Sequence, residues 1–298
     1  MPALPAHMTA IAIRAPGGPD MLVPEQRPLP QPGDGEVLVK VAASGLCASD
    51  LNAIDGKRTL APFPLVLGHE AAGVVTQTGP GVTRLKVGDA VVMSIVPSCG
   101  DCPACVRGRR NYCQTASRAM SRGGLLDGSL RLSRDGQPLH HFLTVSSFAQ
   151  YAVIPESGAV AIDARMPLDR AALISCAVLT GVGAIRNTAR VRPGSRVAVF
   201  GCGGIGLNAV QGARLAGAAR IAAVDVTEEK LDLARRFGAT DVVHAGQEDP
   251  AAAIRRLMSG VDYAFETAGR EQTVQQAWAS LDVGGEAIVV GLMPHGPR

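Results

Sequence analysis

The sequence predicts an all-β, barrel-like domain followed by a doubly wound parallel sheet of the α/β class. Three observations predict it. Short apolar runs separated by turn residues occupy the first half, helical spacing and then strand–helix alternation begin near residue 170, and a glycine-rich turn opens that alternation. We expect two domains, residues 1–177 and 178–298.

The strand-like runs of the first half are short. They cover residues 9–14 and 36–44 and continue in GVVTQTG and DAVVMSIV. The segment PGGPDMLVPEQRPLPQPGDGE, which lies between the first two runs, is rich in Pro and Gly and is interpreted as turns and loops. Short strands with long loops are typical of a barrel-like domain.

The second half alternates apolar strands with helices. Small apolar residues at helical spacing fill DRAALISCAVLTGVGAIRNTARV. Strands are then expected at 196–201, 220–225, 241–245, 262–267 and 286–291, and helices at 204–217, 228–238, 250–258 and 271–281. This alternation indicates a parallel sheet that is covered on both faces.

Composition argues against several classes of function. The net charge is +3, and no long basic run interleaves with aromatic residues, so we expect no nucleic-acid partner. No run of about 18 apolar residues would cross a membrane, and the N-terminus lacks a secretory signal. Seven cysteines, four of them crowded into one loop, favour metal binding over disulfides and therefore a reducing, cytoplasmic location.

Four cysteines have the spacing of metal ligands. They are Cys99, Cys102, Cys105 and Cys113. Four thiolates fill a tetrahedral shell and leave no position for water or substrate, so the spacing predicts a structural zinc site. The alternatives are a four-iron cluster and thiols without a metal.

Three further potential ligands are dispersed along the chain. Cys47 lies in GLCASD, His69 in LGHEAAG and Cys176 in LISCAVLTG. Taken singly, each is more simply a buried small hydrophobe or a structural histidine. A Cys/His/Cys set around zinc would leave the fourth position open for water or an alcohol oxygen, which a catalytic zinc requires.

The segment VAVFGCGGIG is a strand that leads into a glycine-rich turn and a helix. Gly201, Gly203 and Gly206 permit a tight turn and the close approach of a pyrophosphate to the helix N-terminus. Asp225, at the end of the next strand, should accept ribose hydroxyls and repel a 2′-phosphate, which predicts NAD rather than NADP. Cys202 is expected to be a free thiol near the pyrophosphate.

GHEAAGVV, the four-cysteine loop, GCGGIG and Asp225 resemble the zinc-containing alcohol dehydrogenases of the medium-chain dehydrogenase/reductase superfamily. The resemblance extends from about residue 10 to about residue 293. It implies a GroES-like catalytic domain, a Rossmann domain, two zinc ions per chain, and oxidation of an alcohol to an aldehyde or ketone with hydride transfer to NAD. Members of the family continue with a sixth strand, a helix and a return segment, so the resemblance also implies a C-terminally truncated chain.

The resemblance implies roles for residues near the catalytic zinc. Its ligands would be Cys47, His69 and Cys176. Ser49 would contact the alcohol and begin a proton relay, and Asp50 would orient the histidine ligand. The remaining assignments are Glu70 beside the metal; Gly204, Ile205, Lys230, Thr180 and Val290 at the cofactor; and Ile95, Phe142 and Leu143 along the substrate channel.

Two positions depart from the family pattern. The proton relay usually ends in a histidine, and the matching residue is Asn52, so proton release is expected through water or another base. Ala48 stands where several relatives place a basic residue against the pyrophosphate. A homodimer is expected for the family, although the strand that forms it is missing from this sequence.

The substrate and the activity remain open. HHFL (140–143) and two complete zinc sites favour the primary-alcohol or S-(hydroxymethyl)glutathione branch over the polyol branch. Arg118 lies near an arginine of the glutathione-type members, but a solvated surface residue is the simpler interpretation. The alternative of another class is a truncated zinc-binding relative with weak or no catalysis. Six well-placed cysteine ligands argue against a zinc-free quinone reductase, and the lack of a basic face argues against a zinc-finger module.

Overall fold

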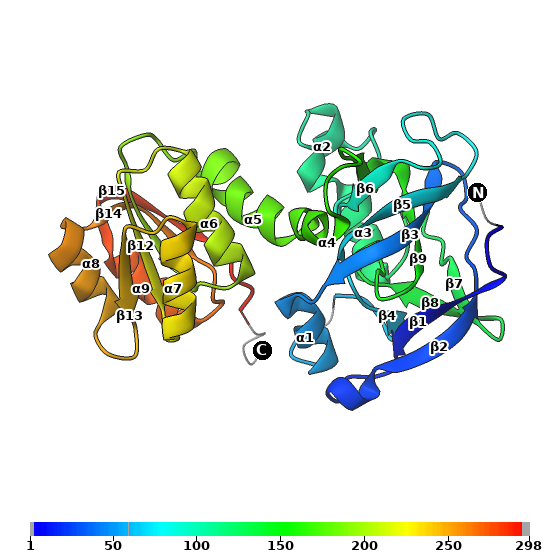
Figure 1. Ribbon diagram of the computed structural model, residues 1–298, viewed down its shortest axis with the longest axis horizontal. Helices are drawn as coiled ribbons and strands as arrows, with labels where there is room; N and C mark the ends of the chain where they lie inside the picture. The colour runs from blue at the N-terminus through cyan, green and yellow to red at the C-terminus, as the bar shows by residue number, and fades with distance from the viewer. Residues whose placement is uncertain (1–2, 59, 294–298) are drawn as a thin grey trace. The chain divides into compact units, whose positions relative to one another are not determined.

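The computed structural model describes residues 3–58 and 60–293. The chain divides into two compact units, Met1–Cys176 and Ala177–Arg298, called unit 1 and unit 2 below. Figure 1 shows unit 1 in blue to green and unit 2 in green to red.

Unit 1 is built mainly from β-strands, as predicted. They are β1 (His7–Ile13), β2 (Val23–Pro28), β3 (Glu36–Gly45), β4 (Leu65–Val66), β5 (Glu70–Thr78), β6 (Ala90–Met93), β7 (Leu132–Arg134), β8 (Gln137–His141), β9 (Tyr151–Pro155) and β10 (Ala159–Ala161). One sheet has the order β2-β1-β4-β8-β7 and the other β10-β6-β5-β3-β9. The second sheet is antiparallel throughout and forms the half-barrel of a GroES-like domain.

Strand β3 lies at the centre of this unit because both of its faces are apolar. Leu38 faces one buried cluster together with Val153, while Val37 and Val39 face another together with Ile154. Alternate residues of a strand point to opposite faces, so a continuous apolar run is buried on both sides. The long pairing of β3 with β5 brings the segment before Cys47 beside the segment after His69.

Helices and turns connect the strands of unit 1. They are α1 (Ala48–Ile54), α2 (Pro103–Val106), α3 (Gln114–Arg122), α4 (Leu168–Ala171) and the 3₁₀ turns η1 (Pro19–Met21), η2 (Arg110–Tyr112), η3 (Glu156–Gly158) and η4 (Ala172–Ser175). Helix α1 begins directly after Cys47, and η4 ends directly before Cys176, so two metal-ligand candidates lie at helix boundaries.

The interpretation of the Pro/Gly-rich segment as turns and loops was wrong over part of its length. Strand β2 lies there and pairs with β1, with Pro24 opposite Ile11 and Pro28 opposite His7. Proline lacks a backbone N–H and is therefore tolerated in strands chiefly at a sheet edge. Strand β2 is such an edge, so its prolines do not prevent the pairing.

Unit 2 contains the predicted parallel sheet. Its strands are β11 (Arg196–Phe200), β12 (Arg220–Asp225), β13 (Asp241–His244), β14 (Val261–Glu266) and β15 (Leu281–Val289), in the order β13-β12-β11-β14-β15. All of its pairings are parallel. Val197 and Val199 of β11 face one apolar cluster, and Ala198 and Phe200 face another. The doubly wound prediction is therefore confirmed.

The helices of unit 2 are α5 (Ala177–Gly183), a π-helical turn (Ala184–Ala189), α6 (Gly204–Leu215), α7 (Glu228–Phe237), α8 (Pro250–Met258) and α9 (Glu271–Ala279). The helical spacing of residues 169–191 is interrupted at Cys176, where φ is −133° and ψ is −74°.

Within the described ranges, no single helix is long and apolar enough to cross a membrane. The bent pair Leu168–Ser175 and Ala177–Ala189 reaches the required length and apolar composition only when the two helices are taken together.

Candidate functional site

The four-cysteine loop forms a closed set of metal-ligand candidates. The sulfur atoms of Cys99, Cys102, Cys105 and Cys113 all lie within 4.8 Å of one another. The Cys99–Cys113 separation is 3.6 Å, and the Cys102–Cys113 separation is 4.0 Å. A tetrahedral ion with bonds of about 2.3 Å separates its sulfur ligands by about 3.8 Å, so the set fits zinc without an open position.

Backbone N–H groups donate to two of these sulfurs. Cys99 N and Ala116 N donate to Cys113 Sγ, and Cys102 N donates to Cys99 Sγ, each at 3.4 Å. Hydrogen bonding from the backbone of Cys105 is the largest contribution that lowers the pKa of Cys102 to about 6. Cys113 also caps the N-terminus of α3 through Ala116, so metal binding and the start of that helix depend on one sulfur.

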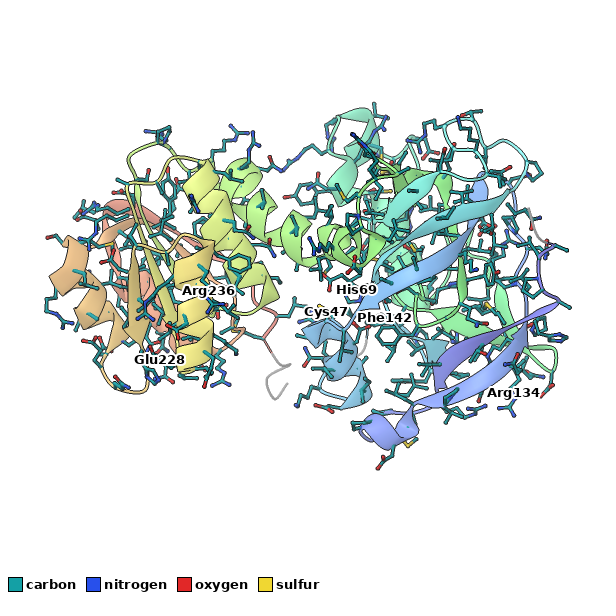
Figure 2. The ribbon with its side chains drawn as sticks, viewed as in Figure 1. Cys47, His69, Arg134, Phe142, Glu228 and Arg236 are labelled. Atoms are coloured by element: carbon teal, nitrogen blue, oxygen red, sulfur yellow. The ribbon has the colours of Figure 1, made fainter. Side chains whose placement is uncertain are left out.

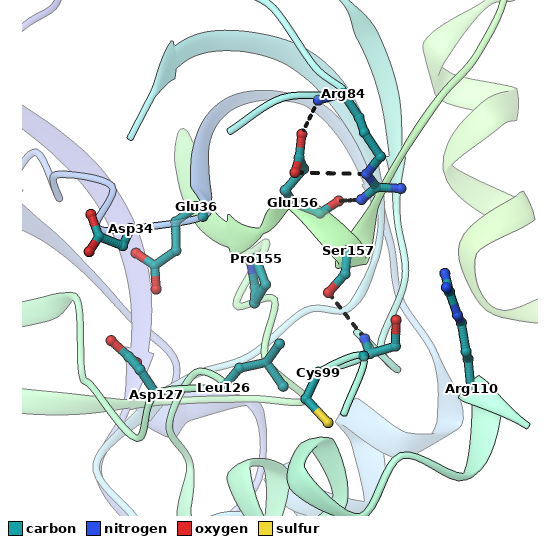
Figure 3. Close-up of a pocket in the computed structure, with 13 residues that line it drawn as sticks. Asp34, Glu36, Arg84, Cys99, Arg110, Leu126, Asp127, Pro155, Glu156 and Ser157 are labelled. Atoms are coloured by element: carbon teal, nitrogen blue, oxygen red, sulfur yellow. Dashed lines mark hydrogen bonds and ion pairs between the residues drawn. The ribbon is translucent and has the colours of Figure 1, made fainter. Parts of the chain in front are cut away.

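A cavity of about 510 Å³ lies beside Cys99, and Figure 3 shows its lining. Ser157 Oγ accepts the N–H of Ser98 at 3.1 Å on one side of Cys99. The carboxylate of Glu156 accepts backbone N–H groups from Thr83 and Leu85. These polar groups are occupied by protein donors, so they reinforce the walls around the four-cysteine loop.

The dispersed candidates converge inside unit 1. Ligand atoms of Cys47, His69 and Cys176 lie within 4.8 Å of one another, and the two sulfurs are 3.9 Å apart. Cys47 follows β3, His69 directly precedes β5, and Cys176 directly follows η4. Two thiols and one imidazole provide three of the four ligands of a tetrahedral zinc, which leaves one position for an exchangeable oxygen ligand.

Asp50 connects two of these ligand segments. Its buried carboxylate accepts the backbone N–H of Cys47 and the backbone N–H of Gly68, each at 3.0 Å. Nδ1 of His69 lies 3.3 Å from Asp50 Oδ2. Because Nδ1 faces this carboxylate, the other ring nitrogen, Nε2, is available to a metal.

Charge and hydrogen bonding prepare Cys47 as a thiolate. The hydrogen bond from Cys176 is the largest contribution that lowers the pKa of Cys47 to about 4, with His69 and the backbone of Ser49 adding to it against burial. The same bond, together with burial, raises the pKa of Cys176. Burial lowers the pKa of His69, but Asp50 and Cys47 outweigh it and raise that pKa to about 9.

The other residues expected at the reaction centre lie around this cluster. Ser49 is half-buried on α1, one turn before Asn52. Glu70 is buried at the start of β5, and its carboxylate lies so close to Gly45 that a Cβ atom there would collide with it. Its negative charge contributes to the raised pKa of Cys176, so Glu70 acts electrostatically on this group of ligands.

Apolar side chains adjoin the same cluster. The ring of Phe142 meets the imidazole of His69 edge to face, with centroids 5.6 Å apart, and Figure 2 labels both. Phe142 and Leu143 belong to one buried cluster, and Ile95 packs against it. Leu143 has a positive φ of 52°, as do its neighbours Thr144 (60°) and Ser146 (55°). Ser146 holds this bend by accepting the N–H of Phe142.

The glycine-rich turn of unit 2 is tight and closely packed against itself. Gly201 has a φ of 94°, and a Cβ atom at Gly206 would overlap the carbonyl oxygen of Gly201. By contrast, Gly203 leaves the surface of the turn bare, since a Cβ there would meet no heavy atom within 4 Å, whereas a Cβ at Gly204 would lie 3.4 Å from Cβ of Ala177. The turn can therefore present its backbone and the N-terminus of α6 to a phosphate.

Asp225 is anchored at the end of β12. Its carboxylate accepts N–H groups from Cys202 at 2.7 Å, Val226 at 2.8 Å and Thr227 at 3.1 Å. Lys230 Nζ lies 3.9 Å from the same carboxylate. A carboxylate offers about four acceptor positions, so capacity for a ribose hydroxyl remains. The Cys202 thiol is free and buried, and burial raises its pKa to about 12.

Thr180 and Ile205 lie on adjoining helices of unit 2. Helices α5 and α6 touch at Gly181, where a Cβ atom would lie 2.5 Å from the carbonyl oxygen of Ile205. Val290 lies one residue beyond β15, and its N–H donates to the carbonyl of Glu266 at 2.8 Å.

Sequence reasoning missed two polar residues at the end of β14, of which Thr267 bonds the glycine-rich turn and Glu266 bonds the residues that follow Thr267. Thr267 Oγ1 lies 2.9 Å from the carbonyl oxygens of both Phe200 and Gly201. Glu266 is completely buried and accepts N–H groups from Ala268 and Gly269. The available signal was their position at the carboxyl end of β14, the strand next to β11, because ligands of such sheets bind at that edge.

Comparison with known proteins agrees with this geometry. Residues 33–164 match the alcohol dehydrogenase GroES-like domain, and residues 204–298 match the zinc-binding dehydrogenase family. An S-(hydroxymethyl)glutathione dehydrogenase of Escherichia coli O139:H28 is 40% identical over 95% of this chain and 77% of its own length.

Solved structures give the same result. An alcohol dehydrogenase zinc-binding domain protein from Burkholderia ambifaria has a TM-score of 0.91 and 39% identity, and a benzyl alcohol dehydrogenase from Acinetobacter calcoaceticus has a TM-score of 0.90 and 34% identity. Each match covers 98% of this chain and 79% of the other. With its two candidate zinc sites and its Rossmann sheet, the chain belongs to the zinc-containing alcohol dehydrogenases of the medium-chain superfamily, which are nicotinamide-dependent oxidoreductases.

Proposed function

We propose that the protein oxidises an alcohol to an aldehyde or ketone and transfers the hydride to NAD. The observation that carries this proposal is the contrast between two metal-ligand sets in unit 1. The four-cysteine set is closed, whereas Cys47, His69 and Cys176 leave one position open. An open position is what separates a catalytic zinc from a structural one.

The donor sets fit zinc and the glycine-rich turn fits a dinucleotide, so each group has residues that would hold it. When bound, zinc supplies Lewis acidity and the nicotinamide accepts a hydride. The reaction balances as alcohol plus NAD⁺ giving the carbonyl product, NADH and one proton. Ser49 would take the hydroxyl proton, and Asn52, which does not titrate near neutral pH, would leave its release to water.

Two residues, Asp50 and Glu70, support the metal ligands in this proposal. Asp50 orients His69 and holds the N–H of Cys47, which keeps the imidazole and the thiolate in place before substrate arrives. Glu70 adds negative charge beside the sulfurs. These groups act by orienting the metal ligands and by their negative charge, so neither of them has to exchange a proton with the substrate.

NAD is proposed over NADP because of Asp225. The three N–H groups that it accepts hold the carboxylate in place at the end of β12. A 2′-phosphate next to a fixed carboxylate would place two negative charges together. Other residues proposed at the cofactor are Gly201, Gly203, Gly204, Ile205, Gly206, Lys230, Thr180 and Val290.

An apolar alcohol is the substrate class that the side chains favour. Ile95, Phe142 and Leu143 form an apolar wall next to His69. Apolar walls exclude water from a site and strengthen its electrostatics. The benzyl alcohol dehydrogenase structure supports an aromatic alcohol as one member of this class.

S-(hydroxymethyl)glutathione is the second candidate substrate. The Escherichia coli relative is named for dehydrogenation of that compound. In this chain, Arg118 provides a cation on helix α3 of unit 1. Arg118 lines a cavity of about 610 Å³ together with Tyr112, Gln114 and Met120. Met120 packs against the cluster that contains Phe142, so this cavity adjoins the proposed substrate wall.

The test combines metal analysis with an activity assay. Purified protein should contain two zinc ions per chain and form NADH with benzylic or medium-chain alcohols. Turnover of the glutathione adduct alone would reject the general-alcohol proposal in favour of the second candidate. Two zinc ions without turnover on any substrate would reject catalysis and leave a zinc-binding relative, and one zinc ion or none would reject the ligand assignment.

A further inference from the structure

The contacts of Asp50 described above join the Cys47 and His69 segments. The segment of Cys176 is attached to unit 1 by a hydroxyl group. Ser175 Oγ accepts the backbone N–H of Ala71 at 2.8 Å and donates to the carbonyl of Ala172 at 2.6 Å. Ser175 is only 3% exposed, and the residue after it is the third ligand.

The accepted N–H has a defined place in the sheet. Ala71 is paired with Ser44 of β3 on one side. On the other side, the pairing of β5 with β6 begins only at Ala72, opposite Val92. The N–H of Ala71 therefore lies one residue beyond the paired stretch of β5 and β6, and it donates to the hydroxyl of Ser175. A buried N–H without an acceptor is costly, so this bond is strongly favoured.

We propose that Ser175 is a positioning residue for the catalytic zinc, because its hydroxyl connects the turn that carries Cys176 to the strand that starts directly after His69. The proposal rests on the function proposed above, in which Cys47, His69 and Cys176 hold zinc. Ser175 then does for the second and third ligands what Asp50 does for the first and second.

Apolar packing alone would not give this result. Ala171 and Ala172 pack against Ala72 and Val92, which holds η4 on the sheet. Such packing has no preferred direction, whereas a hydrogen bond fixes both distance and angle. Zinc requires its ligands within about 0.2 Å of the ideal bond length, so the directional contact has the larger effect on metal binding.

The backbone gives a second reason. Cys176 has the unusual pair φ −133° and ψ −74°, which is neither extended nor helical, and it ends unit 1. Ser175 is the last residue before this turn, so a change in its position rotates the peptide that carries the thiol. Without the hydroxyl, the N–H of Ala71 needs another acceptor, and the sulfur moves away from its separation of 3.9 Å from Cys47 Sγ.

The experiment compares two zinc ions in one molecule. Full-length protein and Ser175→Ala are incubated at 25 °C with a chromogenic chelator, and zinc release is followed with time. The four-cysteine site serves as an internal reference, because Ser175 makes no bond to it. Zinc release should then show two phases, one for each site. We expect the phase of the three-ligand site to become at least about tenfold faster in Ser175→Ala, as for other residues that orient metal ligands, and the phase of the four-cysteine site to stay unchanged.

Ser157→Ala is the matched control. Its hydroxyl also accepts a backbone N–H, that of Ser98, but next to Cys99 of the four-cysteine loop. It should leave release from the three-ligand site unchanged. Cobalt-loaded samples identify the two sites, because four thiolates and two thiolates with one imidazole absorb differently, and the spectrum of the three-ligand site should change in Ser175→Ala alone.

Each outcome is decisive. Two unchanged release phases in Ser175→Ala would overturn the positioning role. Equal acceleration of both phases would also overturn it, since that result means general loosening of unit 1. If the unsubstituted protein holds a single zinc ion, bound by the four-cysteine loop, the proposed function fails instead.

Discussion

At the scale of residues, His141 is buried in a neutral form within unit 1. Its Nε2 accepts the backbone N–H of Arg131 at 3.2 Å. Burial first, and then the charges of Arg131 and His140, lower its pKa to about 4. In the unfolded chain the same group titrates near 6.5, so between these values protons bind the unfolded state more strongly. Its contribution to stability is complete above pH 6.5 and is lost as the pH falls toward 4.

Replacing His141 should reduce this acid sensitivity. His141→Gln keeps an acceptor for Arg131 but cannot take up a proton. The free energy of unfolding of both proteins should fall between pH 7 and pH 4. From the size of the pKa shift, we expect the fall in His141→Gln to be smaller than that in the unsubstituted protein by roughly 2–4 kcal/mol. Urea unfolding at both pH values measures it. His244→Gln, in unit 2, is the control, and an identical pH response of His141→Gln would contradict the argument.

Asp225 supports a second prediction at this scale. Asp225→Asn retains an oxygen acceptor but removes the negative charge that opposes a 2′-phosphate. The preference for NAD over NADP, measured as the ratio of kcat/KM values, should fall by at least about tenfold, because like charges in contact cost several kcal/mol. Zinc content should not change, since unit 1 contains all seven ligand candidates. An unaltered ratio would mean that another group selects the cofactor.

At the scale of elements, the turn between β11 and α6 combines two close approaches. Gly206 faces the carbonyl of Gly201, and Thr267, the residue after β14, bonds that carbonyl. The turn can move little without breaking one of these contacts. Its shape is therefore determined before a dinucleotide binds, which reduces the entropy lost on binding.

Gly206→Ala should disrupt this turn. The added methyl group would overlap a backbone oxygen, which cannot move without shifting the end of β11. NAD affinity, followed by the fluorescence of bound NADH, should fall at least about tenfold. Gly183→Ala is the control, because a Cβ there meets only the amide nitrogen of Asn187 at 3.9 Å and alanine favours a helix. Equal NAD affinity in both variants would refute the prediction.

The same elements show what sequence can predict. The bounds of β11, α6, β12 and α8 were predicted within two residues, because apolar periodicity and glycine signals coincide there. Strand β2 was not predicted, because its prolines indicate a loop and are tolerated in a strand only at the edge of a sheet. Both zinc-ligand sets followed from cysteine spacing and family resemblance. Ser175 and Thr267 did not, because a hydroxyl that bonds a distant backbone group leaves no pattern in the sequence.

At the scale of the whole molecule, the candidate metal ligands and the proposed cofactor-binding residues lie in different units. Every candidate metal ligand lies in Met1–Cys176, and the glycine-rich turn with Asp225 lies in Ala177–Arg298. Each unit has its own apolar clusters. Loss of metal and loss of cofactor should therefore affect different parts of the chain.

Metal removal tests this division. Chelation of both zinc ions should increase amide hydrogen exchange in α2 and α3, whose ends are tied to the cysteines, and around Cys47, His69 and Cys176. Strands β11 to β14 should exchange as before, and added zinc should restore the protection. Increased exchange in those strands would show that unit 2 depends on the metals.

The position of Cys176 also has a consequence for synthesis. It is the last ligand of either set and the last residue of unit 1, so the ribosome has made every candidate ligand before it begins unit 2. Domains generally fold in the order in which they emerge, at roughly 5–20 residues per second. Both metal centres can thus be assembled on the nascent chain on the order of ten seconds before the dinucleotide fold is complete.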